Sequence, residues 1–464
     1  MRIGDEPLTP SAVAAAARAG AIDVALTDEA RARMARAHRT AATATRQRPV
    51  YGRTTGVGAN RSVLVEGGDE REHGLRLLRS HAGGMGEPLA PEVVRATILI
   101  RIAQLCAGGA GQRPELADAL IALLHAPDDE LPVLHDLGGL GTGDLTVLGE
   151  LGLALPAIEE GDALALMSSN AATFAVATLA WHDLRVLLDA GLGVAALSFA
   201  AVEGNAEAYA PEIGTGRPLP GAVAVAARMR ALVAGGAVPV RIQDPFALRC
   251  VPQVGGAFHD ALAHLHDVLA VELNAASENP LIAGADVLHH GGFHAASCAL
   301  ALDALRLAVV PFGTLSAARL RHLMEPGLTG LTPFLSGDAP GSSGVLIAEY
   351  VAADALARLR AVAAPAVLGS ATLSRGLEEH ASFAWQAAGQ ARRAVDHLRL
   401  VFALEWVAAE RALRMKGSDA CPALRSLGER FEDRLEDRPL ADDAEIAAAA
   451  LPALAEAVRS VPTA

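Results

Sequence analysis

Cysteines are scarce in this sequence and they are poorly placed to pair. The 464 residues include only four, Cys106, Cys250, Cys298 and Cys421, and they lie far apart with no CxxC pair. This spacing implies neither a zinc site nor a disulfide framework. Reduced thiols, as in a cytoplasmic protein, are the simplest expectation.

Positive charge is also in short supply. The formal net charge is −14, which argues against a nucleic-acid partner or an anionic membrane surface. The first residues, MRIGDEPLTPS, lack the basic and apolar regions of a signal peptide. The longest uncharged apolar stretch, 163–181, contains several Ser, Thr and Asn residues, so it predicts a buried core helix rather than a membrane span.

Aromatic residues make up only 3% of the chain, whereas Ala, Leu and Arg are abundant, so helix dominates the expected structure. With 52% hydrophobic residues the chain is not disordered, and its length allows two or three domains or one large one. We expect helices over 10–20, 28–46, 74–79, 91–106, 115–125, 253–274, 293–323, 343–362, 378–411, 424–435 and 444–458.

These spans predict a mainly α protein. Residues 1–200 form a mixed helical, loop-rich domain, and residues 201–464 form an extended bundle of long helices with a short helical end. Pro311 is expected to kink the helix over 293–323.

A glycine-rich run, GGLGTGDLTVLG, occupies residues 138–149. It lacks the lysine of a phosphate-binding P-loop, and no clear strand precedes it, so a nucleotide site is not expected. Taken alone, the run predicts a turn that opens a helix at Asp144.

The run is one of seven motifs that occur in a fixed order. They are YGRTTGVG (51–58), RSHAGGMGEPL (79–89), GTGDL (141–145), DPFALRCVPQ (244–253), SENPLI (277–282), GGFHAA (291–296) and EEHASF (378–383). Together they resemble the aromatic amino acid lyase family, most closely its histidine ammonia-lyases, over about residues 5–415. The resemblance implies the helical fold of that family, related to fumarase and aspartase. It also implies a homotetramer whose active sites combine residues from several chains.

In that family an Ala-Ser-Gly tripeptide cyclises into an electrophilic 4-methylidene-imidazol-5-one (MIO) ring. The matching tripeptide here is Gly141-Thr142-Gly143. Gly141 is expected to be harmless, because only the carbonyl of that residue takes part, but Thr142 would add a methyl group to the electrophilic carbon. Ser168 replaces a family asparagine and Phe246 a family tyrosine, so two polar contacts are lost. These departures favour an unmodified Thr142, and an MIO-type ring stays the alternative. Neither a metal nor a nucleotide is implied, because the His289–His290 pair has no third ligand at metal spacing.

The resemblance also assigns the residues that handle substrate. Tyr51 matches the base, and to act near neutral pH its pKa must be lowered by a positive charge or a helix N-terminus. Arg249 matches the residue that grips a carboxylate. His81 and Glu378 stand where the family reads the substrate side chain, and Phe293 where an aromatic ring lies near the MIO. Ordinary structural roles stay open for all five.

The leading hypothesis is a lyase that eliminates a small leaving group, ammonia in the family, from an amino acid or related carboxylate with an imidazole-like side chain. One alternative is an MIO-free homologue in specialised metabolism that performs dehydration, isomerisation, cyclisation or hydrolysis. The other is a non-catalytic homologue, which the presence of both Tyr51 and Arg249 disfavours.

Overall fold

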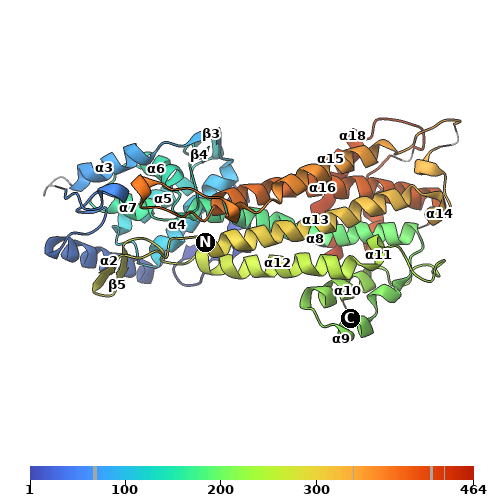
Figure 1. Ribbon diagram of the computed structural model, residues 1–464, viewed down its shortest axis with the longest axis horizontal. Coiled ribbons are helices and arrows are strands. Elements are labelled where there is room, and N and C mark those ends of the chain that lie inside the picture. The colour runs from blue at the N-terminus through green and yellow to red at the C-terminus, as the bar shows by residue number, and fades with distance from the viewer. Residues whose placement is uncertain (66–69, 338, 419–421, 433, 464) are drawn as a thin grey trace. The chain divides into compact units, whose positions relative to one another are not determined.

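The protein is mainly helical, as predicted. Its computed structural model describes residues 1–65, 70–337, 339–418, 422–432 and 434–463 (Figure 1); Cys421 lies outside them. The chain divides into two compact units. The first contains Met1–His182, Leu265–Asp303 and Pro365–Gly389, and the second contains Asp183–His264, Ala304–Ala364 and Gln390–Ala464. The units thus interleave along the sequence, and a boundary near residue 200 stays a prediction.

Eighteen α-helices are labelled along the described residues. They are α1 Pro10–Arg18, α2 Asp28–Gln47, α3 Glu70–His81, α4 Pro91–Cys106, α5 Pro114–Leu124, α6 Leu145–Leu153, α7 Asp162–Met167, α8 Ala171–Ala201, α9 Pro211–Gly216, α10 Pro220–Leu232, α11 Phe246–Arg249, α12 Val251–Glu272, α13 Ala296–Leu323, α14 Pro326–Thr329, α15 Ile347–Val362, α16 Ala384–Lys416, α17 Pro422–Gly428 and α18 Ala441–Ser460.

Strands are short and form three separate two-stranded sheets in the described chain. β1 (Arg2–Ile3) pairs in parallel with β2 (Ala25–Leu26). β3 (Met85–Pro88) with β4 (His135–Leu137), and β5 (Leu281–Ala283) with β6 (Asp286–Leu288), are antiparallel. Short 3₁₀ turns include η1 (Gly58–Asn60) and η6 (Ser374–Gly376).

Local capping signals explain why several helices begin where the sequence predicts. The Thr9 hydroxyl accepts the Ala12 N–H at 3.2 Å, with Pro10 as the first helical residue of α1. Thr27 caps α2 in the same way, accepting from Ala30 at 3.2 Å. Such caps satisfy N–H groups that the first turn of a helix leaves without partners.

Several predicted helices differ in extent from the observed ones, and those expected over 293–323 and 343–362 begin at Ala296 and Ile347. The stretch 163–181 is interrupted at Ser168–Asn170, between α7 and α8, and the helix expected over 424–435 ends at Gly428 within α17. Residues 378–383 are not helical, because the Phe383 N–H donates to Leu140 O at 2.8 Å instead. Pro311 lies within the continuous helix α13, so a bend there stays a prediction.

The first unit is organised around α4, which packs against α1, α2 and α5 (blue to cyan in Figure 1). All residues of α4 from Val93 to Cys106 are buried. A helix that is covered on every side belongs to the core. Its buried polar side chains, Arg101 and Gln104 among them, therefore need internal partners.

The second unit has an aromatic core between its long helices. The Phe312 ring lies 5.7 Å from that of Phe258 and 5.6 Å from that of Phe402. A Cβ on Gly191 would approach both Phe312 and Phe402 at 2.7–2.8 Å, so a glycine admits these rings. Aromatic pairs at this separation stabilise a core beyond the area they bury.

Two helical stretches, Asp162–Ala201 and Ala296–Leu323, are long and apolar enough to cross a membrane by length and composition alone. Within the described structure, 78% and 56% of their most apolar windows are buried. Buried core helices pass the same test, so these stretches are weak grounds for a membrane span.

Candidate active site

The glycine-rich run forms a tight loop between β4 and α6. A strand does precede it, contrary to expectation, since β4 ends at Leu137. However, β4 is a three-residue strand paired only with β3, and the strand–helix–strand unit of a dinucleotide-binding fold is not formed here. The loop ends at Asp144, which immediately precedes α6 as predicted.

Position 141 favours glycine in this structure, and the expectation that Gly141 is harmless to the chemistry, because only its carbonyl takes part, stays a prediction. Its φ is +72°, a conformation that residues with side chains rarely adopt. A Cβ there would collide with Ser382 Oγ and lie 2.7 Å from Ala384 N. The loop and the segment before α16 therefore pack together only because position 141 has no side chain.

Hydrogen bonds hold the loop on both sides of Thr142. The Gly141 carbonyl accepts the Ser382 hydroxyl at 2.6 Å and the Ala295 N–H at 3.4 Å. The Gly143 N–H donates to Asn170 Oδ1 at 2.8 Å. Closing an MIO-type ring joins the Gly143 nitrogen to the Gly141 carbonyl carbon. Donors on the carbonyl and an acceptor on the amide are what that step needs, so these residues fit the ring.

Asn170 is the amide that the sequence prediction missed. Its Nδ2 donates to Phe293 O at 2.5 Å while its Oδ1 holds Gly143, so it ties the loop to the GGFHAA segment. The family has an asparagine at the position of Ser168, and a serine supplies no amide. Asn170 stands two residues later, in the same break between helices, and that polar break in an apolar stretch was the available signal.

Asp144 anchors the far end of the loop. Its carboxylate accepts the Thr173 N–H and hydroxyl, both at 2.7 Å, and its own N–H donates to Ser169 O at 2.7 Å. Complete burial raises the pKa of Asp144 to about 6, although the hydrogen bonds from Thr173 oppose the shift. A buried carboxyl with a raised pKa thus lies next to the glycine loop.

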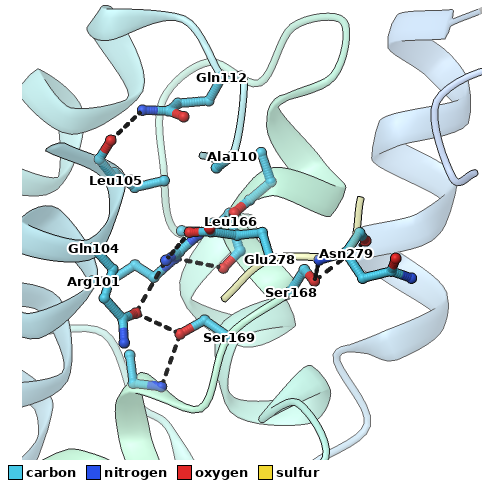
Figure 2. A network of polar contacts seen from close by, with 12 residues as sticks. Arg101, Gln104, Leu105, Ala110, Gln112, Leu166, Ser168, Ser169, Glu278 and Asn279 are labelled. Atoms are coloured by element: carbon cyan, nitrogen blue, oxygen red, sulfur yellow. Dashed lines mark hydrogen bonds and ion pairs between the residues drawn. The ribbon is translucent and has the colours of Figure 1, made fainter. Parts of the chain in front are cut away.

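A buried polar network supports the Ser168–Asn170 break (Figure 2). Arg101 pairs with Glu278 at 2.8 Å and donates to Leu166 O at 3.0 Å, at the end of α7. Ser168 Oγ accepts the Asn279 N–H at 2.9 Å, beside Glu278. Because Ser168 makes these contacts through its hydroxyl, it acts here as a link to the 277–282 segment.

These segments enclose a pocket of about 760 Å³ within the first unit. Six of the predicted site residues line it: Tyr51, Thr142, Gly143, Ser168, Phe293 and Glu378. Residues outside the prediction complete the walls, and those with polar side chains include Arg61, Asn279, His289, His290, His294, Glu379 and His380.

The hydroxyl oxygen of Tyr51 accepts a backbone hydrogen bond in this pocket. The Gly58 N–H, at the start of η1, donates to Tyr51 Oη at 2.8 Å. The pKa of Tyr51 is nevertheless raised, mainly by burial and also by the negative charge of Glu378. The hydrogen bond from the Gly58 N–H and the positive charge of Arg61 oppose this shift. The expected lowering influences are present, but the predicted net depression of the pKa is wrong for the free chain.

Glu378 lies close to that hydroxyl. An added Cβ on Gly58 would be 3.5 Å from Glu378 Oε1, and the Ala59 N–H donates to Ser374 Oγ at 2.9 Å. The turn that holds Tyr51 is therefore bound to the segment that carries Glu378.

Two histidines of the pocket wall pair with each other. His294 Nε2 lies 3.0 Å from His380 Nδ1, and their rings stack at 5.1 Å. Burial lowers the pKa of His294, and the neighbouring His380 lowers it further. No group of three His, Cys, Asp or Glu side chains in the described chain is arranged to hold a metal ion.

The remaining predicted residues do not line this pocket. His81 is the last residue of α3, with Nδ1 2.8 Å from Leu77 O. Phe246 and Arg249 belong to α11 in the second unit. The guanidinium of Arg249 lies 4.5 Å from the centroid of the Phe246 ring, a cation–π contact that needs no hydroxyl. Arg249 Nε is buried without a hydrogen-bond partner in the described chain.

Two residues that the sequence analysis did not identify, Ser382 and Arg61, differ in whether a motif contains them. Ser382 belongs to the EEHASF motif, so its contact with the glycine loop could have been anticipated. Arg61 follows the YGRTTGVG motif and belongs to none of the seven, so only the fold brings it to the pocket.

Comparisons with known proteins agree on one family. A sequence profile described as aromatic amino acid lyase matches residues 8–160 and 150–433. A histidine ammonia-lyase from Symbiobacterium thermophilum is 35% identical, over 94% of this chain and 94% of that protein.

Solved structures show the same fold along almost the whole chain. The histidine ammonia-lyase of Trypanosoma cruzi has a TM-score of 0.91 at 26% identity, covering 100% of this chain and 96% of its own. A tyrosine aminomutase from Streptomyces globisporus has a TM-score of 0.92 at 27% identity, with 99% and 98% covered.

Proposed function

The chain belongs to the aromatic amino acid lyase family, as its seven motifs predict. From this premise we propose that it eliminates a small leaving group, ammonia in the family, from an amino acid or related carboxylate with an imidazole-like side chain. One observation carries the proposal. The pocket of the first unit gathers Tyr51, the Thr142 loop, Phe293 and Glu378 from four separate segments of the chain. Curated relatives are histidine ammonia-lyases, which are carbon–nitrogen lyases.

Tyr51 is the proposed base for the β-proton. Burial and the charge of Glu378 both keep its hydroxyl protonated in the free protein. A cationic group of the substrate beside Glu378 would cancel one of these influences. The Gly58 N–H and Arg61 then stabilise the phenolate, so substrate binding itself prepares the base.

Gly141-Thr142-Gly143 is the proposed source of an MIO-type ring, which would supply an electrophile for the leaving amine. The contacts of Gly141 O with Ser382 and of Gly143 N with Asn170 support ring closure. The methyl group of Thr142 favours the alternative, an MIO-free enzyme with other proton-transfer chemistry. Loss of a β-proton together with ammonia is difficult without an electrophile, so the two proposals predict different reactions.

Arg249 is the proposed carboxylate clamp, because a guanidinium can bind a carboxylate with two N–H groups. Its buried Nε has no hydrogen-bond partner among the described residues, and its Nη1 donates to Gln243 Oε1 at 2.9 Å. His81 is proposed to bind the substrate side chain.

We also propose a cytoplasmic homotetramer with shared active sites. The exposed Ile347, Tyr350 and Val351 of α15, at i, i+3 and i+4, would be covered by such an assembly.

Intact mass separates the two chemistries. Loss of two water molecules from the purified protein supports the ring, and an unmodified mass overturns the ammonia-lyase proposal. The catalytic test follows with L-histidine, by the absorbance of an α,β-unsaturated acid. Tyr51→Phe should lower kcat by about 10²–10⁴-fold with little change in unfolding temperature. Undiminished turnover would remove Tyr51 from the role of base.

A further inference from the structure

Arg61 is a charged group of the pocket wall that lies outside every family motif. It is exposed and directly follows η1, where its N–H donates to Gly58 O at 3.1 Å. The same turn donates the Gly58 N–H to Tyr51 Oη. The backbone that positions the base hydroxyl therefore also positions this arginine.

Glu378 brings the opposite charge to the same hydroxyl. Its carboxylate lies close to Gly58, and the Ala59 to Ser374 hydrogen bond joins η1 to the 373–378 segment. Arg61 and Glu378 also act on the pKa of Tyr51 in opposite directions, as two charges near one hydroxyl must.

Neither charge is neutralised within the described residues. No ion pair or side-chain hydrogen bond there involves the Arg61 guanidinium or the Glu378 carboxylate, and they do not pair with each other. Both line the pocket of about 760 Å³, which has room for an amino acid. A free amino acid carries the two complementary charges, an ammonium and a carboxylate.

We propose that Arg61 is a second carboxylate-binding residue. Together with Glu378 it orients a zwitterionic substrate next to the Tyr51 hydroxyl. The inference rests on the proposed function, since it assumes an amino-acid substrate. Arg61 lines the same first-unit pocket as Glu378 and Tyr51, so its proposed contact does not depend on Arg249. The substrate class that it selects is an amino acid with both a free ammonium and a free carboxylate.

Calorimetric titration with three related probes tests the inference. L-Histidine carries both charged groups, histamine lacks the carboxylate, and imidazole-4-propionate lacks the ammonium. Arg61→Gln should weaken histidine and imidazole-4-propionate by about tenfold, the size expected for a charge-assisted hydrogen bond, and leave histamine unchanged. Glu378→Gln should weaken histidine and histamine and spare imidazole-4-propionate. Arg61→Lys should restore part of the lost affinity.

Arg46→Gln is the matched control, because Arg46 is an exposed arginine of α2 outside the pocket. Equal affinities for the wild type and Arg61→Gln, or equal weakening of all three probes, would overturn the inference and leave the proposed function standing. If the wild type binds none of the probes, nor phenylalanine or tyrosine, then the proposed function fails and the inference fails with it.

Discussion

Among the described residues, a buried arginine–glutamate pair lies in each unit, and these two pairs differ in their hydrogen bonds. In the second unit Arg319 and Glu405 are 1% and 0% exposed, and Glu405 Oε1 and Oε2 both accept hydrogen bonds. Ser198 and Ser316 donate to the same carboxylate at 2.6 and 2.5 Å. All of these groups lie on the long helices α8, α13 and α16, so this pair stabilises the packing of those helices.

In the first unit Arg101 and Glu278 are 0% and 2% exposed, but the pairing is incomplete. Glu278 Oε2 has no hydrogen-bond partner among the described residues, while Arg101 gives its other donors mainly to backbone carbonyls beside the pocket. Burial raises the pKa of Glu278, with Arg101 opposing the shift. The comparison teaches that complete pairing marks the scaffold, whereas a carboxylate left partly unpaired marks the neighbourhood of the pocket.

The largest effect should follow from breaking the complete pair. Glu405→Ala leaves Arg319 charged and buried and two serine hydroxyls without their acceptor. We expect a loss of about 3–5 kcal/mol in the free energy of unfolding, measured by urea denaturation. Asp354→Ala, which breaks the exposed Arg358–Asp354 pair of α15, is the control and should cost under about 0.5 kcal/mol. Similar losses for both would refute the comparison.

The incomplete pair should cost less to break. In Glu278→Ala, Arg101 keeps its bonds to Leu166 O and Gln104 Oε1, so we expect a loss of about 2 kcal/mol. The Ser168–Asn170 break should loosen as well, seen as faster amide exchange in residues 165–171. A loss as large as that of Glu405→Ala, with unchanged exchange, would assign Glu278 to the scaffold.

Asp144 extends the comparison to the pH dependence of the free energy of unfolding. Its folded pKa of about 6 is above that of an unfolded aspartate, so between pH 4 and 6 the folded state binds more protons than the unfolded state. The free energy of unfolding should therefore fall as the pH rises through this window, by up to about 1.4 kcal/mol per pH unit. Urea titrations of Asp144→Asn should lack this component of the slope. Parallel curves for the two proteins would exclude it.

The smallest effect is expected at Ser382. Its hydroxyl donates to Gly141 O and accepts the Ala384 N–H at 3.2 Å, so it also caps α16. Ser382→Ala should cost about 1 kcal/mol. If the proposed ring forms in the wild type, the variant should contain less dehydrated protein by intact mass. Unchanged dehydration would show that Ser382 does not assist ring closure.

Sequence reasoning was strongest where the determinants are local. Thr9 and Thr27 cap helices through contacts three residues away, and Pro91 begins α4 as predicted. It was weakest where distant segments decide the outcome. The Phe383 N–H finds Leu140 O rather than a helical partner, and this removes Glu378 from the helix expected over 378–411.

The pocket shows the same division. Four of the motifs supply five of the six predicted residues that line it, and the sixth, Ser168, was identified from its match to a family asparagine. The pKa of Tyr51 depends on burial and on charges from two other segments, and no local pattern encodes that sum. The roles of Tyr51, Arg249 and His81 stay predictions until variants are measured.

The collision at position 141 restricts how this chain can change. Restoring the family tripeptide Ala-Ser-Gly requires substitutions at Gly141 and Thr142, and they are not interchangeable in order. Thr142→Ser removes one methyl group and fits the present backbone, whereas Gly141→Ala meets Ser382 and Ala384 first. A variant with Ala at position 141 should therefore fold without strain only if the segment before α16 shifts, whereas Thr142→Ser adds no atoms to the loop.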